Sequence, residues 1–378
     1  MQNSIVTLSQ TKLIQKLWRD KDIDYIAFVT SSWHFLSALS TISWLKKSKQ
    51  VGKGIILICE HPAEGQIIDE NILNKTWFEG QEIYTFRFSA LVSDKAVMKY
   101  IMAHDSIGKP FYILRPIMPK LDFTVLLYDC GARKNIIHVI LEEGMASYIR
   151  DWKGWLFEER WTAGAGNVWK QFSNRTWKKF LYTKALKSRG EFIENTLFIS
   201  KDGKLSANKR AITYLKRTIE ELEDVYDFSR YSNYSNSVII CTQPYGEQNY
   251  ILKGADIKII RECCKMAIKK GYRVIIKPHP REKNLMKYEG MGAEIDVDNA
   301  VPLEAILAQA KPKPQYIVGI TTTTLVTAQL FWKIPAFSVA RLIEREAYSK
   351  ELIGDIDNYC KTFSGMIKIP QNIQEVSG

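Results

Sequence analysis

Short apolar runs alternate with longer stretches of helical periodicity through the first 150 residues. β-Branched and aromatic runs typical of buried strands occupy 25–30, 54–59, 82–88, 123–128 and 136–141. Between the first two runs, residues 31–47 begin with serines suited to an N-cap and continue with apolar residues at helical spacing. This alternation predicts a parallel α/β sheet that is covered on both faces.

A second α/β unit begins near residue 237. Its predicted strands are 238–242, 273–277, 316–319 and 336–339, with helices at 255–270, 302–310 and 323–333. A polar helix at 208–226 and a turn-rich stretch at 230–237 precede it. We therefore predict an N-terminal Rossmann-like domain (1–190), a connecting helix and linker (191–236) and a C-terminal Rossmann-like domain (237–378). Two such domains facing a central cleft are typical of the GT-B type of nucleotide-sugar transferase. Many two-domain binding proteins share this architecture.

The segment 151–190 interrupts the alternation. It holds five of the ten tryptophans and nine Lys or Arg against three acids, a net charge of 9 − 3 = +6. Tryptophans among cations suit the surface of an anionic membrane, where the rings lie at headgroup level. A helical lid with inward-packed tryptophans is the alternative.

The whole chain is basic, with 53 Lys and Arg against 41 Asp and Glu and a formal charge of +12 over 378 residues. That balance favours an anionic partner, although net charge also serves solubility. A hydrophobic content of 46% excludes a disordered chain. Six cysteines without a CxxC motif indicate buried thiols in a reducing compartment. We expect neither a signal peptide nor a membrane span.

The first candidate for chemistry is Lys277–Glu282 (KPHPRE), directly after a predicted strand. Parallel α/β sheets bind ligands beyond the carboxyl ends of their strands. Pro278 and Pro280 restrict the backbone on both sides of His279. A rigidly presented imidazole can stabilise or protonate a departing phosphate, and Lys277 adds positive charge. A turn with an exposed histidine is the ordinary alternative.

Two adjacent carboxylates, Glu142 and Glu143, directly follow the predicted strand 136–141 and precede a glycine that allows a sharp turn. Like-charge crowding and partial burial raise the pKa of a carboxyl group toward that of a useful base. The alternative is the common preference of acids for the first turn of a helix.

Hydroxyl groups follow another predicted strand in Gly319–Leu325 (GITTTTL), which opens a helix. Hydroxyls and unpaired N–H groups at a helix start form an anion site for a phosphate, although a threonine N-cap is common. Upstream, Pro302-Leu303-Glu304 is a normal helix start. Glu304 can also hold both hydroxyls of a ribose.

Motifs of other chemistries are absent from the sequence. The five histidines lack zinc-ligand spacing, and there is no GxxxxGK[ST], GxGxxG or GxSxG. No Asp-x-Asp pair closes an apolar strand of the N-terminal domain. We therefore expect no metal requirement.

Three motifs together resemble those of the bacterial sialyltransferases, which carry an acidic pair with glycine, a His-Pro and a Ser/Thr motif in this order. Here they are Glu142-Glu143-Gly144, His279-Pro280 and Thr321–Thr324. The similarity is to glycosyltransferase family 52, which sialylates lipooligosaccharide and capsule, and to the polysialyltransferases of family 38. The acid and the histidine are 279 − 142 = 137 residues apart, which puts one in each predicted domain. The third motif is all threonine where serine is frequent, and either hydroxyl can bind phosphate.

The resemblance implies an inverting, metal-independent sialyltransferase that moves sialic acid from CMP-sialic acid to a hydroxyl of a cell-surface glycan. It implies no cofactor. Glu142 would be the general base, with Glu143 in reserve, and His279 would stabilise or protonate the leaving CMP as a cationic imidazole. The implied donor-binding residues are Lys277, Pro280, Glu304, Thr321, Thr322 and Thr323. Ser31, Ser32 and His34, after the first strand, receive an acceptor role.

Several alternatives remain open on the sequence alone. The chain can be a polysialyltransferase, or a CDP-polyol phosphotransferase of the teichoic-acid type, against which the acidic motif argues. A non-catalytic basic protein that binds membrane or nucleic acid explains the charge but not three ordered motifs. We expect a cytoplasmic protein with a nucleotide-sugar donor, a glycan acceptor and no nucleic acid, and peripheral contact with the membrane through 151–190.

Overall fold

A computed structural model of the chain describes residues 23–29, 31–49, 51–60, 81–87, 108–116, 135–149, 191–201, 204–224, 228, 234–298 and 301–376. The chain divides into two compact units. The first comprises residues 1–143 and 151–218, and the second comprises residues 144–150 and 219–378. The first unit thus continues past 190, where we predicted a linker. The predicted strand at 123–128 and the tryptophan-rich segment 151–190 lie outside the described residues.

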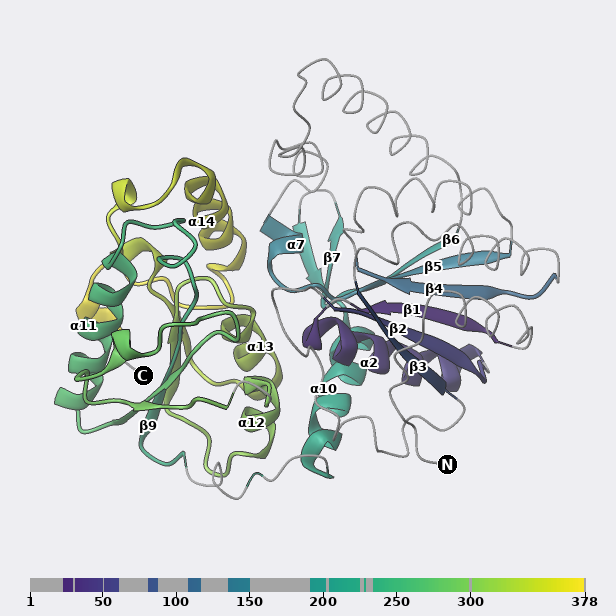
Figure 1. Ribbon diagram of the computed structural model, residues 1–378, viewed down its shortest axis with the longest axis horizontal. Helices are drawn as coiled ribbons and strands as arrows, with labels where there is room; N and C mark the ends of the chain where they lie inside the picture. Colours follow the sequence, from purple (N-terminus) through teal and green to yellow (C-terminus); the bar gives the residue numbers. More distant parts are fainter. Residues whose placement is uncertain are drawn as a thin grey trace, which may run out of the picture. The chain divides into compact units, whose positions relative to one another are not determined.

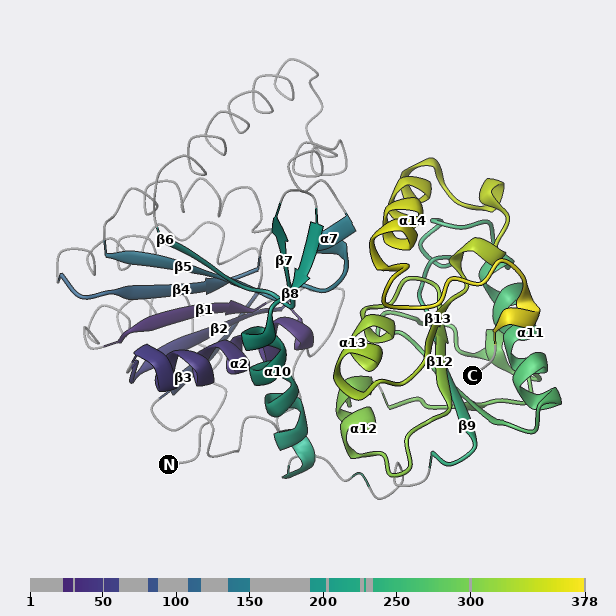
Figure 2. The same ribbon diagram turned by 180° about the vertical axis from the view of Figure 1, so that it is seen from behind.

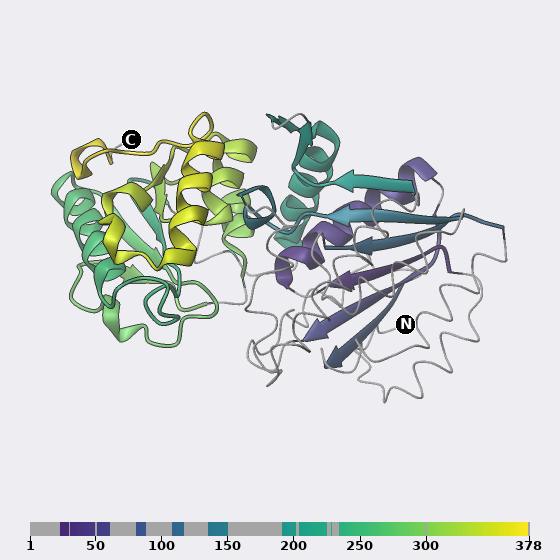
Figure 3. The ribbon, with the colours of Figure 1, turned by 90° about the horizontal axis from the view of Figure 1, so that it is seen from above.

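Six parallel strands form the sheet of the first unit, in the order β3-β2-β1-β4-β5-β6. They are β1 (Tyr25–Val29), β2 (Gly54–Glu60), β3 (Gln81–Arg87), β4 (Phe111–Arg115), β5 (Ile136–Leu141) and β6 (Glu191–Asn195). Figure 3 shows their arrowheads at one edge of the sheet. β1, β4 and β5 are buried throughout, which is why they are continuous apolar runs rather than alternating ones. The strand order is that of a Rossmann fold.

Helix α2 (Ser32–Lys49) packs against β1, β4 and β5. It starts at Ser31, whose carbonyl oxygen accepts from the N–H of Phe35 at 3.0 Å. Nearly all residues from 34 to 45 are buried, and the three lysines of the last turn suit the negative end of the helix dipole. No helix in the described part of the chain is long and apolar enough to cross a bilayer.

The polar segment that we predicted as a connector runs from the first unit into the second, with the boundary after residue 218. β7 (Phe198–Lys201) and β8 (Lys204–Ala207) form an antiparallel hairpin, followed by α10 (Lys209–Glu220) and the 3-10 helix η3 (Glu221–Asp224). The helix predicted over 208–226 is therefore confirmed as α10 with η3. The guanidinium of Arg210 lies 4.1 Å from the ring centroid of Trp44, which packs α10 beside α2.

Five parallel strands form the sheet of the second unit, in the order β11-β10-β9-β12-β13. They are β9 (Ser237–Cys241), β10 (Arg273–Lys277), β11 (Glu294–Ile295), β12 (Tyr316–Gly319) and β13 (Ala336–Ser338). The four predicted strands of this unit are confirmed. The chain runs from β9 to β10 and β11 on one side and then crosses to β12 and β13 on the other side. The switch point of a Rossmann fold therefore lies between β9 and β12.

Helices cover both faces of the second sheet. α11 (Ala255–Lys269) lies on one face, and α12 (Leu303–Gln309) and α13 (Thr323–Trp332) lie on the other (Figures 1 and 2). α14 (Lys350–Phe363) contacts the short helix α7 (Ala146–Ile149), and the unit ends with the 3-10 helix η8 (Ile373–Glu375). Cys241, Cys263, Cys264 and Cys360 are buried free thiols, as predicted for cysteines of this chain.

Candidate active site

The carboxyl ends of β9, β10 and β12 bring three polar segments to one edge of the second sheet. Thr242 and Gln243 follow β9, His279 follows β10, and Thr321 follows β12. Gly319 permits close approach here, because a Cβ atom on it would lie 3.2 Å from the carbonyl oxygen of Cys241. This edge at the switch point is where α/β sheets bind nucleotides.

His279 stands in a tight, hydrogen-bonded turn. The backbone N–H of Arg281 donates to its Nδ1 at 3.1 Å, and the N–H of Glu282 donates to its carbonyl oxygen at 2.9 Å. Because Nδ1 accepts, the proton of the neutral ring lies on Nε2. Burial, helped by the charge of Arg281, lowers the pKa of His279 to about 4. The imidazole is therefore neutral at pH 7 in the unliganded protein, whereas the resemblance implied a cation.

The other two residues of this motif with an implied role in donor binding lie differently. Pro280 is exposed. The Nζ atom of Lys277 forms an ion pair of 2.9 Å with Asp296 Oδ2 and also bonds to the carbonyl oxygen of Asp298. Lys277 thus ties the segment after β11 to the end of β10.

The threonine motif begins helix α13, as predicted. Thr322 is the N-cap, and its Oγ1 accepts from the N–H of Thr324 at 3.4 Å. Gln243 Oε1 accepts from the N–H of Thr321 at 3.0 Å and from its Oγ1 at 3.2 Å, and the Tyr245 hydroxyl contacts the same Oγ1. Within the described residues, the N–H groups of Thr322 and Thr323 have no hydrogen-bond acceptor. These two half-exposed donors at a helix start are suited to a phosphate.

Glu304 links two helices beneath the threonine motif. Its Oε1 atom accepts from the hydroxyls of Thr324 at 2.9 Å and Thr327 at 3.0 Å. Burial raises the pKa of this carboxyl. The backbone N–H of Glu304 also bonds to this carboxyl group. That Glu304 holds a ribose hydroxyl stays a prediction.

The glycine of the acidic motif belongs to the second unit. Gly144 has a φ of 100°, and a Cβ atom on it would lie 2.8 Å from Thr323 Oγ1. The N–H of Met145 donates to that same oxygen at 3.3 Å. The Asn358 side chain donates to the carbonyl oxygen of Ile149 at 3.0 Å, so the whole segment 144–149 is fixed within this unit.

The two acids themselves belong to the first unit, at the end of β5. Glu142 is only 1% exposed. Its N–H donates to Ser37 Oγ at 2.7 Å, and its Oε2 atom accepts from the N–H of Leu197 at 2.7 Å. Glu143 is half-buried. The carboxylate of Glu142 is therefore held in one orientation by the backbone of the β6–β7 turn.

The three residues to which we gave an acceptor role lie at the start of α2. Ser31 Oγ accepts from the N–H of His34 at 3.1 Å, and Ser32 is exposed. His34 is buried, and burial lowers its pKa to about 4. Ser31 thus begins the helix, and His34 lies in the packed interior of the first unit.

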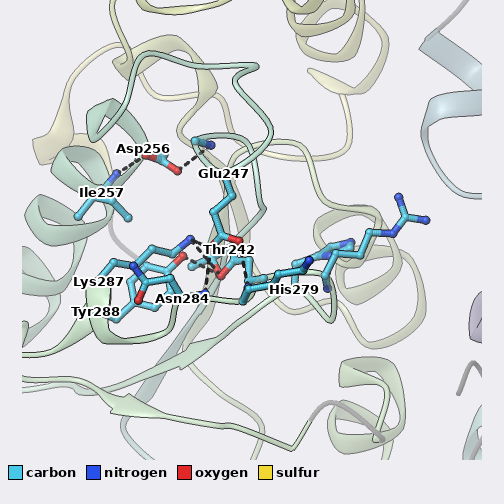
Figure 4. A network of polar contacts seen from close by, with 12 residues as sticks. Thr242, Glu247, Asp256, Ile257, His279, Asn284, Lys287 and Tyr288 are labelled. Carbon is cyan, nitrogen blue, oxygen red and sulfur yellow. Dashed lines mark hydrogen bonds and ion pairs between the residues drawn. The ribbon is translucent and has the colours of Figure 1, made fainter. Parts of the chain in front are cut away.

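Sequence reasoning missed four polar residues near this sheet edge, all in the second unit. Gln243 and Tyr245 hold Thr321. Glu282, the last residue of KPHPRE, accepts from Thr242, and Glu247 accepts from the backbone of the segment after it (Figure 4). The available signal was their position just after β9 and β10. No described residues form a cluster of three or more His, Cys, Asp or Glu suited to a metal.

Each unit has the strand order of a Rossmann fold. The second unit carries His279 and the unbonded N–H groups of Thr322 and Thr323 at its switch point. Two Rossmann-like units with such a site define the GT-B class of nucleotide-sugar transferases. The facing cleft of that class stays a prediction for this chain. The alpha-2,8-polysialyltransferase (POLYST) family profile matches residues 25–341. The chain belongs to this family and is a glycosyltransferase of the CMP-sialic acid-dependent kind.

Solved structures show a weaker likeness. A 2,6-sialyltransferase of Photobacterium sp. JT-ISH-224, solved with CMP and lactose, is 13% identical over 91% of this chain and 77% of its own, with a TM-score of 0.46. A Photobacterium damsela sialyltransferase is 11% identical over 91% of this chain and 80% of its own, with a TM-score of 0.48. A UDP-GlcNAc 2-epimerase of Methanocaldococcus jannaschii is 13% identical over 92% of this chain and 93% of its own, also with a TM-score of 0.48. No curated protein sequence matches. Because these identities and TM-scores are low, no site residue is inferred from the solved structures. The assignment to a family rests on the match over residues 25–341.

Proposed function

We propose that this chain transfers sialic acid from CMP-sialic acid to a glycan hydroxyl, with inversion and without a metal. The observation that carries the proposal is the sheet edge of the second unit. There the Nε2–H of His279 follows β10, and the unbonded N–H groups of Thr322 and Thr323 follow β12. These two strands are separated by β9 alone, so their axes lie roughly 10 Å apart. One bound nucleotide can therefore span both groups of donors.

The reaction is a single displacement. The acceptor oxygen attacks the anomeric carbon of sialic acid while the bond from that carbon to the phosphate oxygen breaks. The electron pair of that bond leaves with CMP, and the acceptor proton passes to a carboxylate of the enzyme. Attack opposite to the leaving group inverts the anomeric carbon through an oxocarbenium-like state.

His279 stabilises the leaving phosphate by donating a hydrogen bond from Nε2. Its Nδ1 atom accepts from the N–H of Arg281. Protonation of Nδ1 would turn this acceptor into a donor and break the hydrogen bond. The negative charge that develops on the CMP oxygen is met by a neutral donor in a partly buried site, where such a bond is strong. Between the two implied roles, stabilisation is therefore favoured over proton transfer.

Glu142 is the proposed general base. The N–H of Leu197 bonds to its Oε2 atom and holds the carboxylate in one orientation. Glu143, one residue nearer the second unit and half-buried, is the alternative base. Glu142→Gln keeps a carbonyl oxygen for the N–H of Leu197 but cannot accept the proton.

The second unit would hold CMP with Thr322 and Thr323 on the phosphate and Glu304 on the ribose. Among the acceptors left open, the family name favours extension of a sialic acid chain through α-2,8 linkages. The acceptor is then itself an anion, which suits the basic chain. A role in capsule or lipooligosaccharide synthesis at the inner face of the membrane is proposed with it.

The deciding experiment incubates the protein with CMP-sialic acid and a panel of galactoside and sialoside acceptors. We expect transfer to sialosides, no loss with EDTA, and no product from CDP-glycerol. Glu142→Gln should bind CMP normally and transfer nothing, with Glu143→Gln as the matched variant. Transfer from CDP-glycerol, or full turnover in Glu142→Gln and Glu143→Gln alike, would overturn the proposal.

A further inference from the structure

A buried carboxylate, Glu282, lies three residues after His279, and the reaction above gives it no role. Its side chain is 0% exposed. Thr242 Oγ1 and the Tyr288 hydroxyl each donate to Glu282 Oε2 at 2.9 Å, and Lys287 Nζ lies 3.6 Å from the same oxygen (Figure 4). Three donors from two segments, Thr242 after β9 and the adjacent residues Lys287 and Tyr288, thus converge on one carboxylate oxygen.

The backbone of Glu282 closes the turn that presents His279. Its N–H donates to the His279 carbonyl oxygen at 2.9 Å, and the preceding N–H, of Arg281, donates to Nδ1. The backbone of this residue therefore shapes the turn, while its carboxylate binds the core. Thr242, one of its partners, directly follows β9 and donates its own N–H to the Lys277 carbonyl oxygen at 3.1 Å.

A second carboxylate holds the rest of the segment. Glu247 accepts from the N–H of Lys283 at 3.0 Å, the N–H of Asn284 at 3.3 Å and Lys287 Nζ at 2.9 Å. Lys287 therefore joins Glu247 to Glu282. The segment 282–288 is fixed on both sides, which leaves the turn at 278–281 little freedom.

The bonds of Glu282 are unevenly divided between its oxygens. Oε1 is buried and has no hydrogen-bond donor within the described residues. Burial raises the pKa of this carboxyl, while Lys287, Tyr288 and Thr242 act in the opposite direction. A buried acid with one unbonded oxygen contributes little net stability, so its main effect is expected on the geometry of the turn.

We propose that Glu282 is a positioning residue for sialyl transfer, which holds the His279 turn so that Nδ1 accepts from Arg281 and Nε2 presents its proton. The inference rests on the role proposed for His279. Glu282 itself touches neither the donor nor the acceptor in this proposal.

Substitutions at 282 separate geometry from charge. Glu282→Gln keeps a carbonyl oxygen for Thr242 and Tyr288, whereas Glu282→Ala leaves both hydroxyls without it. Tyr288→Phe removes one donor and keeps the ring, so it carries the test if the alanine variant does not fold. Glu294→Gln, at an exposed residue of β11 that pairs with Arg273, is the matched control.

The first measurement is an NMR titration of the histidine Cε1–H signals without substrate, with His279 assigned by its loss in His279→Gln. The pKa of His279 is about 4 in the wild type. It should rise by about one unit or more toward 6.5 in Glu282→Ala, because the loosened ring becomes hydrated, and less in Tyr288→Phe. In Glu282→Gln the pKa of His279 should stay at the wild-type value. An unchanged pKa in folded Glu282→Ala or Tyr288→Phe would overturn the proposal.

The second measurement is steady-state transfer from CMP-sialic acid. Glu282→Ala should lower kcat by about 10- to 100-fold with a KM for the donor within about threefold, because the loss falls on the leaving-group interaction. Glu282→Gln should recover most of kcat, and Glu294→Gln should match the wild type. If the wild type transfers no sialic acid but the titration moves as expected, the proposed function fails and the positioning of His279 stands.

Discussion

Gly144 lies directly against Thr323 within the second unit. A Cβ atom at Gly144 would come 2.8 Å from Thr323 Oγ1, and the N–H of Met145 donates to that oxygen at 3.3 Å. The φ of Gly144 is 100°, which side chains rarely adopt. The glycine of the acidic motif is therefore needed both for its backbone conformation and for the space it leaves, and it fixes the start of 144–149 on the threonine motif.

Gly144→Ala should destabilise the protein by about 1–3 kcal/mol, because the methyl group adds a clash to a strained φ. Urea unfolding measures this loss. Gly271→Ala is the matched control, since Gly271 has a φ of 81° with nothing within 4 Å of a built Cβ, and reports the cost of φ alone.

Combining Gly144→Ala with Thr323→Ala tests the clash itself. Thr323 Cβ would lie 4.0 Å from the new methyl group, which is ordinary contact. The double variant should regain the steric part of the loss and keep the part due to φ. Equal losses in Gly144→Ala and Gly271→Ala would show that the clash is relieved without cost.

Gln243→Ala should weaken binding of the donor more than it slows transfer. Gln243 Oε1 accepts from both the N–H and the Oγ1 of Thr321, which orders the turn before the phosphate-binding N–H groups. We expect the KM for CMP-sialic acid to rise about tenfold, the worth of about one hydrogen bond, with kcat within about threefold. Gln248→Ala, at an exposed position of the same loop, is the control. A fall in kcat at constant KM would contradict this assignment.

Glu304 should discriminate ribose from deoxyribose. If its Oε2 accepts from a ribose hydroxyl, 2′-deoxy-CMP should inhibit the wild type about 10- to 100-fold more weakly than CMP, the range for a hydrogen bond to a charged group. Glu304→Gln keeps an acceptor for Thr324 and Thr327 and should reduce this ratio severalfold. A ratio near one in the wild type would leave Glu304 a purely structural link between α12 and α13.

Strand positions followed from the sequence where the strands are buried and apolar, as in β1, β9 and β10. β4 was missed because FYILR ends in Arg115, whose charge argues against a buried strand. Arg115 is nonetheless buried, and its Nε donates to His138 Nδ1 at 3.5 Å. β6 (EFIEN) was missed because an edge strand with two acids has no apolar signature.

The candidate site was predictable in part for the same reason. His279 and Thr321–Thr323 were found because they follow apolar strands, and parallel strands end at one edge. The contact of Gly144 with Thr323 joins residues 179 apart (323 − 144), and the convergence of Thr242 and Tyr288 on Glu282 depends on side-chain packing. Neither leaves a periodic or spacing signal in one sequence.

Stability should fall as the pH is lowered from 7.5 to 5.0. The pKa is about 4 for His34 and His279 and about 3 for His138, all lowered chiefly by burial. Between the ordinary value near 6.5 and these values, the unfolded chain binds protons that the folded protein does not. Each histidine then destabilises the fold by about 2 kcal/mol at pH 5.

His279→Gln measures the contribution of His279 to this loss of stability, because glutamine binds no proton in this pH range. The raised pKa values of Glu282 and Glu304 act oppositely, since these groups gain protons in the folded state first as pH falls. They are common to both proteins and cancel in the comparison. Urea unfolding at pH 7.5 and 5.0 should show a drop smaller by about 2 kcal/mol in His279→Gln than in the wild type. The same drop in both proteins would mean that His279 has its ordinary pKa in the folded state, which would contradict the burial of the ring from which its neutral form is argued.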